Sequence, residues 1–179
     1  MSKRYFVVEG NNDESILLRL LPKELLKDTR IIVAGGYSAA LSGIQTLFTR
    51  TNCPIYFFFD ADEISSDESE DKELFARNYL KPLFNNELHF FSFKPEIEIL
   101  FFYKKELLEK IFSCSISDEK WQEGKMQPKK VLIELTGNGD ITTLLYKLTP
   151  EIIEQFQNNL TLKEMIEKLS FTEQLTTTA

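Results

Sequence analysis

The sequence is poor in the residue types that build soft-metal and redox sites. It contains two cysteines, Cys53 and Cys114, which lie far apart and form no C-x-x-C pair. Isolated cysteines argue against a cysteine-type zinc site and are typical of a protein in a reduced cytoplasm. The single histidine, His89, excludes mechanisms that need several imidazoles. We expect it to be a structural residue in a half-buried strand.

Long hydrophobic runs are also absent. No apolar stretch approaches the roughly 20 residues that a helix needs to cross a membrane. The first residues, MSKRYFVVEG, have a brief basic start and a short apolar run, and no small-residue cleavage site follows. This pattern predicts a strand rather than a signal peptide. We therefore expect a cytoplasmic protein without membrane contact.

Positive charge is scarce as well, because 21 Lys and Arg face 28 Asp and Glu, which gives a net charge of −7. A negative protein is a poor partner for nucleic acid unless its acidity is local. Here it is local: residues 60–73 hold eight acids against Lys72 alone, so the rest of the chain is neutral overall. We interpret residues 67–73 as an exposed face without chemistry, and Glu63 as a solvated neighbour.

What the sequence does contain is enough apolar material for a sizeable core, with 42% hydrophobic residues and 15 phenylalanines in 179 residues. Continuous apolar or aromatic segments predict strands at residues 4–9, 30–34, 54–59 and 87–93. Such runs are typical of parallel strands that are covered on both faces. Helical patterns alternate with them, notably at 38–50 and 71–84. This alternation predicts an α/β fold with a mainly parallel sheet flanked by helices.

The pattern changes after Pro95. Stretches at 96–112, 127–136, 150–157 and 161–171 have helical spacing and are joined by polar loops. We therefore predict an α/β core over residues 1–95 and a helical C-terminal extension over residues 96–179, packed on the core.

Carboxylates follow two of the predicted strands directly. Glu9 closes the first strand, and Asp60 and Asp62 close the third, while Gly35 and Gly36 follow the second. Ligands of open α/β sheets bind beyond the carboxyl ends of the strands. Because crowded carboxylates repel, and hard divalent ions prefer oxygen ligands, we expect a Mg²⁺ site at this edge. Alternation along a strand would turn Asp60 and Asp62 to the same side.

Each of these features also has a structural alternative. Asp13 is either a second ligand beside Glu9 or an acid that caps the following helix. Glu96 and Glu98 follow Pro95 as in an ordinary helix start, and metal ligation by one of them is equally open. Gly35 and Gly36 are turn residues first, and contact with a phosphate is their second interpretation.

Two motifs together carry a resemblance to a known family. VVEGNND at residues 7–13 and FFFDADE at residues 57–63 resemble the two acidic motifs of the TOPRIM domain, over about residues 3–95. That Rossmann-like domain occurs in topoisomerases, bacterial primases, OLD-family nucleases and ribonucleases of the M5 type. The resemblance implies that Glu9 is the acid of the first motif and that Asp60 and Asp62 chelate Mg²⁺.

The sequence is most similar to the OLD branch, which has a second acid matched by Asp13, a glycine-rich turn matched by residues 33–40, and paired glutamates matched by Glu96 and Glu98. This implies two Mg²⁺ or Mn²⁺ ions, the first held by Glu9 and Asp13, the second by Asp60 and Asp62 with Glu96 or Glu98. It also implies a catalytic lysine beyond the sheet, for which Lys125 is our candidate and Lys129 the alternative.

The resemblance implies a divalent-metal-dependent nuclease that hydrolyses phosphodiester bonds, with DNA as the favoured substrate. One alternative is a non-catalytic TOPRIM subunit that acts with a separate ATPase, since no G-x-x-x-x-G-K-[ST] segment is present. Others are an M5-type ribonuclease, although ISSDESED lacks the proline-glycine that follows D-x-D there, and a phosphate-binding domain that does not cut. A homodimer is also open.

Overall fold

The computed structural model describes residues 4–62, 66–81, 87–137 and 139–176. The chain divides into two compact units, the first made of residues 1–14 and 28–97 and the second of residues 15–27 and 98–179. The division falls two residues beyond the predicted boundary. It also assigns residues 15–27, which the sequence placed with the sheet, to the helical second unit.

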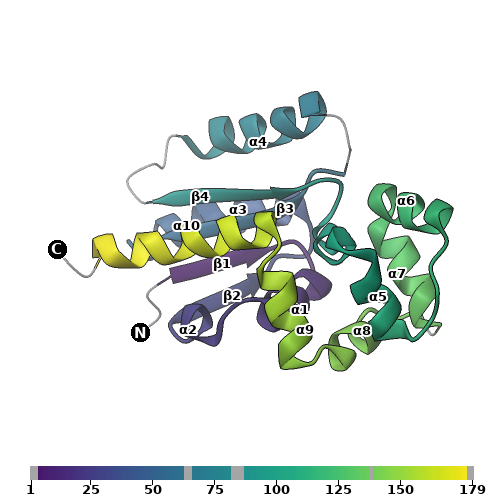
Figure 1. The fold of residues 1–179 in the computed structure, drawn as a ribbon. Coiled ribbons are helices and arrows are strands. Elements are labelled where there is room, and N and C mark those ends of the chain that lie inside the picture. The colour runs from purple at the N-terminus through teal and green to yellow at the C-terminus, as the bar shows by residue number, and fades with distance from the viewer. Residues whose placement is uncertain (1–3, 63–65, 82–86, 138, 177–179) are drawn as a thin grey trace. The chain divides into compact units, whose positions relative to one another are not determined.

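The first unit contains a parallel sheet with helices (Figure 1). Its described strands are β1 (Arg4–Val8), β2 (Thr29–Val33), β3 (Ile55–Asp60) and β4 (Leu88–Phe93), in the order β2-β1-β3-β4. All three pairings are parallel, and β1 lies between β2 and β3. The helices α3 (Tyr37–Phe48) and α4 (Ser66–Leu80) connect these strands. The predicted α/β fold with a mainly parallel sheet is confirmed.

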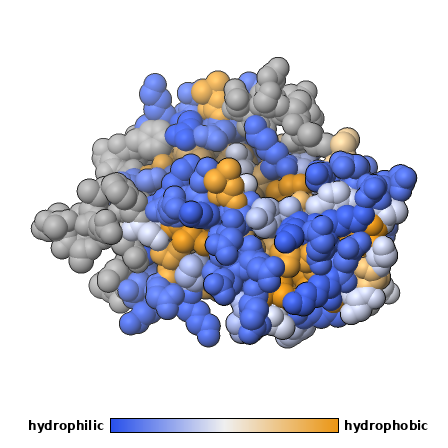
Figure 2. All heavy atoms as spheres, in the orientation of Figure 1, coloured by the Kyte–Doolittle hydropathy of each residue, from blue (hydrophilic) through white to orange (hydrophobic). Residues whose placement is uncertain are grey.

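Side chains on both faces of the sheet are buried, which explains why the strand sequences do not alternate. On one face Val7, Phe57 and Phe59 form a core with Ala40 and Ile44 of α3. Phe6, Tyr56 and Phe58 alternate with them and are also buried. Phe6 meets Tyr56 and Phe58 edge-on, with ring centroids 5.5 and 5.0 Å apart. On the surface drawn in Figure 2, hydrophilic residues predominate and hydrophobic side chains show only in small areas.

The expectation for His89 is confirmed. It lies on β4, is partly buried, and its ring stacks on that of Tyr56 with centroids 4.8 Å apart. Burial lowers the pKa of this imidazole, so a neutral packing role suits it.

Helix α4 begins earlier than the sequence predicted, at Ser66 instead of residue 71, and ends at Leu80. Residues 66–70 of the acidic segment therefore belong to a helix rather than to a loop. The predicted end at residue 84 and the interpretation of Glu63 lie outside the described residues.

The second unit is helical. It contains the later part of α1 (Asn11–Leu20) and α2 (Lys23–Leu26), and then the 3₁₀ segment η2 (Ile97–Tyr103) from Glu98 onward. The remaining helices are α5 (Lys105–Phe112), α6 (Asp118–Met126), α7 (Pro128–Thr136), α8 (Thr142–Lys147), α9 (Pro150–Gln157) and α10 (Leu160–Thr176). None of the described helices is long and apolar enough to cross a membrane.

The sequence missed three of these helices, α2, α6 and α8, and merged two other helical segments. α6 is mostly polar and α8 has only six residues, so neither shows a clear apolar period. The predicted helix at 96–112 is divided at Lys104, whose backbone is extended (φ −144°, ψ 119°).

One glycine of the second unit is required by packing. A Cβ at Gly124 would lie 1.9 Å from a ring carbon of Phe102, which itself packs on Trp121 with ring centroids 5.3 Å apart. Phe102 is buried, so its ring has little room to move. The glycine therefore permits α6 to approach Phe102.

We predict that Gly124→Ala destabilises the protein by about 1–3 kcal/mol, because the added methyl group overpacks the site. In an open helix position the same change would stabilise by about 0.5–1 kcal/mol, since alanine is the better helix former. The measurement is the free energy of unfolding by urea denaturation.

The matched control is Gly43→Ala in α3, where a Cβ would meet no atom within 4 Å. This variant should be unchanged or slightly more stable. A Gly124→Ala protein as stable as the Gly43→Ala protein would contradict the packing argument.

Candidate metal centre

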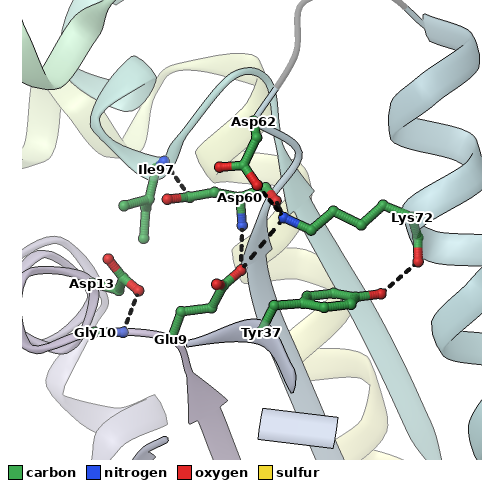
Figure 3. Close-up of polar contacts among 8 residues, drawn as sticks. All are labelled: Glu9, Gly10, Asp13, Tyr37, Asp60, Asp62, Lys72 and Ile97. Atoms are coloured by element: carbon green, nitrogen blue, oxygen red, sulfur yellow. Dashed lines mark hydrogen bonds and ion pairs between the residues drawn. The ribbon is translucent and has the colours of Figure 1, made fainter. Parts of the chain in front are cut away.

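The structure brings together the acids that end two adjacent strands. Glu9 follows β1 and Asp60 ends β3, and these strands pair directly. The backbone N–H of Asp60 donates a hydrogen bond of 3.1 Å to Oε1 of Glu9 (Figure 3). The two acids are 51 positions apart in sequence, so the parallel pairing of β1 and β3 creates this contact.

Gly35 and Gly36 hold the backbone of Glu9. Their N–H groups both donate to the Glu9 carbonyl oxygen, each at 2.9 Å. Both have positive φ angles, 85° and 116°, which glycine adopts without strain. Because these N–H groups already have an acceptor, they do not offer the free donors that the predicted phosphate contact requires. The structure supports their first interpretation as turn residues.

Asp13 caps the helix that follows β1. Its Oδ2 accepts a 2.8 Å hydrogen bond from the N–H of Gly10. The carbonyl oxygen of Gly10 accepts a hydrogen bond from the N–H of Glu14 in the first turn of α1. This is the reach-back contact of a capping box. Asp13 is buried, with 8% of its surface exposed. The capping interpretation is therefore observed, and a role of Asp13 as a metal ligand stays a prediction.

The carboxylate of Asp60 faces the segment that follows β4. The N–H of Ile97 donates to its Oδ1 at 2.9 Å. The N–H of Ala61 donates to the carbonyl oxygen of Phe93, and the N–H of Asp62 donates to that of Pro95. These bonds hold the chain after β4 against the end of β3.

As a result, Asp60, Glu96 and Glu98 each offer a carboxylate oxygen within 4.8 Å of the others. Asp60 and Glu96 are partly exposed and Glu98 is buried. Opposite ligands of a hard divalent ion are about 4–5 Å apart, because metal–oxygen bonds are about 2.0–2.6 Å long. In spacing and chemistry this donor set fits Mg²⁺ or Mn²⁺. Glu96 and Glu98, which the sequence left open, therefore belong to the best candidate ligand set.

Asp62 lies outside that set of three acids. β3 ends at Asp60, and Asp62 adopts a positive φ of 62°, so the alternation expected from a continuing strand does not apply. Its side chain is 74% exposed and forms an ion pair with Lys72, with Oδ2 and Nζ 2.6 Å apart. In this structure the two acids of the D-x-D motif therefore take different partners.

Lys72 lies among these acids, and the sequence reasoning did not single it out. Its Nζ lies 2.6 Å from Asp62, 3.9 Å from Oε1 of Glu9 and 4.7 Å from the ring centre of Tyr37, and it also donates to the carbonyl oxygen of Asp60 (Figure 3). A signal was present in the sequence. Lys72 precedes the buried Ala76 and Leu80 by four and eight residues, so it lies on the inward stripe of α4.

The pKa values of two groups in this centre, the carboxyl of Glu9 and the hydroxyl of Tyr37, are raised by their surroundings. Burial raises the pKa of Glu9, and the neighbouring charges of Asp62 and Asp13 add to this, while Lys72 and the N–H of Asp60 oppose it. Burial and the charges of Glu9 and Glu73 raise the pKa of Tyr37 to about 12. Tyr37 is therefore a neutral donor, and its hydroxyl donates to the carbonyl oxygen of Lys72 at 2.6 Å.

The candidate catalytic lysines lie in the second unit. Lys125 is exposed on α6, and its Nζ lies 5.6 Å from the ring centre of Trp121. Lys129 is exposed on α7. A catalytic role for either lysine stays a prediction.

Comparisons with known proteins leave the family open, because no family model, curated protein or solved structure matches the chain. The resemblance to the TOPRIM domain therefore rests on the sequence motifs alone.

We predict that Glu9→Gln stabilises the metal-free protein at pH 7. A carboxyl whose pKa is raised by folding binds its proton more tightly in the folded state, so its ionised form costs stability above that pKa. We expect the melting temperature to rise by about 2–4 °C, the shift that ~1 kcal/mol produces in a chain of this size. The difference should shrink as the pH falls toward the ordinary pKa of glutamate, where both states are protonated.

Melting curves measured with a chelator at pH 7 and pH 5 test this prediction. Glu154→Gln, which removes an exposed glutamate of α9, is the control and should leave the melting temperature unchanged. A Glu9→Gln variant that melts below the wild type at pH 7 would show that the carboxylate is favourable where it lies.

Proposed function

We propose that the protein is a Mg²⁺- or Mn²⁺-dependent nuclease of the TOPRIM type that hydrolyses phosphodiester bonds, with DNA as the favoured substrate. The observation that carries the proposal is the meeting of Glu9 and Asp60 at adjacent strand ends, with Glu96 and Glu98 beside Asp60. Acids from three separate stretches form one oxygen-rich centre at the edge where α/β sheets bind ligands. Both motifs of the resemblance contribute to it.

The candidate ligands of the ion are Asp60, Glu96 and Glu98. When bound there, a hard divalent ion would lower the pKa of water and stabilise negative charge on a phosphate. The chain itself sets the geometry: the N–H of Ile97 orients one oxygen of Asp60, and the N–H of Asp60 orients Glu9.

Glu9 is a candidate proton acceptor for the reaction. Its raised pKa makes it a better base than an ordinary glutamate, which suits general base catalysis near neutral pH. In the hydrolysis, the water oxygen forms a bond to phosphorus while the bond from phosphorus to the leaving ester oxygen breaks. The water's proton passes to Glu9, and the leaving oxygen takes a proton from solvent or an acid.

We predict that Asp60→Asn lowers the rate of Mg²⁺-dependent cleavage by about 100-fold or more, the scale seen when one charge-stabilising group is removed from an active site. The substitution keeps the size of the side chain and an oxygen that can accept from Ile97, so the fold should survive. The measurement is cleavage of plasmid, single-stranded DNA and RNA by the full chain, with Mg²⁺, with Mn²⁺ and with a chelator.

Glu106→Gln, which removes an exposed acid at the start of α5, is the matched control and should cut like the wild type. Equal cleavage by the Asp60→Asn and wild-type proteins would point to a contaminating nuclease. A wild-type chain that cuts none of the three substrates with either ion would contradict the proposal that the chain is catalytic by itself.

A further inference from the structure

Lys72 occupies a position in which oxygen atoms surround a positive charge. Its Nζ contacts a carboxylate oxygen of Asp62 at 2.6 Å, donates to the carbonyl oxygen of Asp60, and lies 3.9 Å from Oε1 of Glu9. The ring of Tyr37 lies on a further side, with its centre 4.7 Å from Nζ. Carboxylate and carbonyl oxygens are also the ligands that hard metal ions prefer. The ammonium group therefore sits where a metal ion would find suitable ligands.

The backbone of α4 holds Lys72 in this position. The same helix face carries Ala76 and Leu80, which are buried in the core of the first unit. The hydroxyl of Tyr37 bonds to the carbonyl oxygen of Lys72, and the Lys72 side chain is only 18% exposed. Lys72 is thus held both at its backbone and at its ammonium group, whereas the ammonium group of an exposed lysine moves freely in solvent.

The position of Lys72 differs from the candidate metal position in the groups it uses. Lys72 contacts the carbonyl oxygen of Asp60, whereas the carboxylate of Asp60 belongs with Glu96 and Glu98. An ion bound by that second set leaves the ion pair of Lys72 intact. An ion placed between Glu9 and Asp62 would have to displace the ammonium group, because two cations on the same carboxylates repel strongly.

We propose that Lys72 is the resident cation of the position between Glu9 and Asp62 and excludes a metal ion from it. The proposal rests on the proposed function only for the ion near Asp60. With an ion at Asp60, Glu96 and Glu98, the centre would hold one metal ion and one ammonium group. During cleavage the ammonium group of Lys72, which lies beside Glu9, would stabilise the negative charge of the phosphate. In two-metal enzymes the second ion has this role.

The test counts Mn²⁺ ions bound per full-length chain, by titration with electron paramagnetic resonance of the free ion. We expect the Lys72→Gln variant to bind one ion more than the wild type, because glutamine removes the charge and leaves the oxygens of Glu9 and Asp62 in place. Equal ion counts in the two folded proteins overturn the proposal. Circular dichroism establishes that both are folded.

Two further variants locate the additional ion. Lys72→Arg keeps the positive charge and should keep the wild-type count, while Lys72→Gln combined with Asp62→Asn should lose the additional ion. An additional ion that survives in the double variant would not lie between Glu9 and Asp62, which overturns the proposal.

If Lys72→Gln does not fold, two variants that keep Lys72 test the proposal, namely Asp60→Asn and Asp62→Asn. Asp60→Asn should weaken wild-type Mn²⁺ binding by about 10-fold or more, the scale of a disturbed metal centre, whereas Asp62→Asn should leave it nearly unchanged. If both substitutions weaken binding equally, Asp62 is a metal ligand and the proposal is overturned.

The ion count also separates this proposal from the nuclease proposal. A wild type that binds no ion, together with a Lys72→Gln variant that binds one, supports the role of Lys72 and contradicts metal-dependent catalysis at Asp60. Two ions on the wild type, both weakened by removal of Glu9 or Asp62, overturn the role of Lys72 and leave the nuclease proposal standing.

Discussion

Electrostatic repulsion among carboxylates is the constraint on which the rest of this centre depends. The parallel pairing of β1 with β3 places Glu9 against Asp60, and the bonds after β4 add Glu96 and Glu98. Like charges this close need hydrogen-bond donors or cations nearby. The structure supplies backbone N–H groups from Asp60 and Ile97 and one ammonium group from Lys72. Burial is the main cause that raises the pKa of Glu9, and the charges of Asp62 and Asp13 add to it.

Three further residues hold the backbone around the centre in place. Gly35 and Gly36 adopt positive φ angles and fix the backbone of Glu9, and Asp13 fixes the turn into α1. These contacts pre-arrange the acids before any ligand binds. Under the proposed function, a cation bound by these acids would stabilise the folded protein.

Much of the fold followed from local pattern. The strands β1 and β3 read as continuous apolar runs because both faces of the sheet are buried, and their ends were predicted to within a residue or two. The polar α6 and the short α8 were missed because neither shows an apolar period. The expected direction of Asp62 came from a rule for strands, which does not apply two residues after β3 ends.

The sequence by itself determined which acids could meet, because strand ends in a parallel sheet share one edge. Glu9 and Asp60 were identifiable on that ground, whereas the glutamates after Pro95 were suggested by the resemblance to the OLD branch. Only the tertiary structure decided how the charges are divided between partners. Asp60 joins Glu96 and Glu98, and Asp62 turns to Lys72, since a backbone angle at one residue and the packing of a helix ten residues later set those directions. Side-chain partners across such distances depend on how the whole unit packs, which local sequence does not encode.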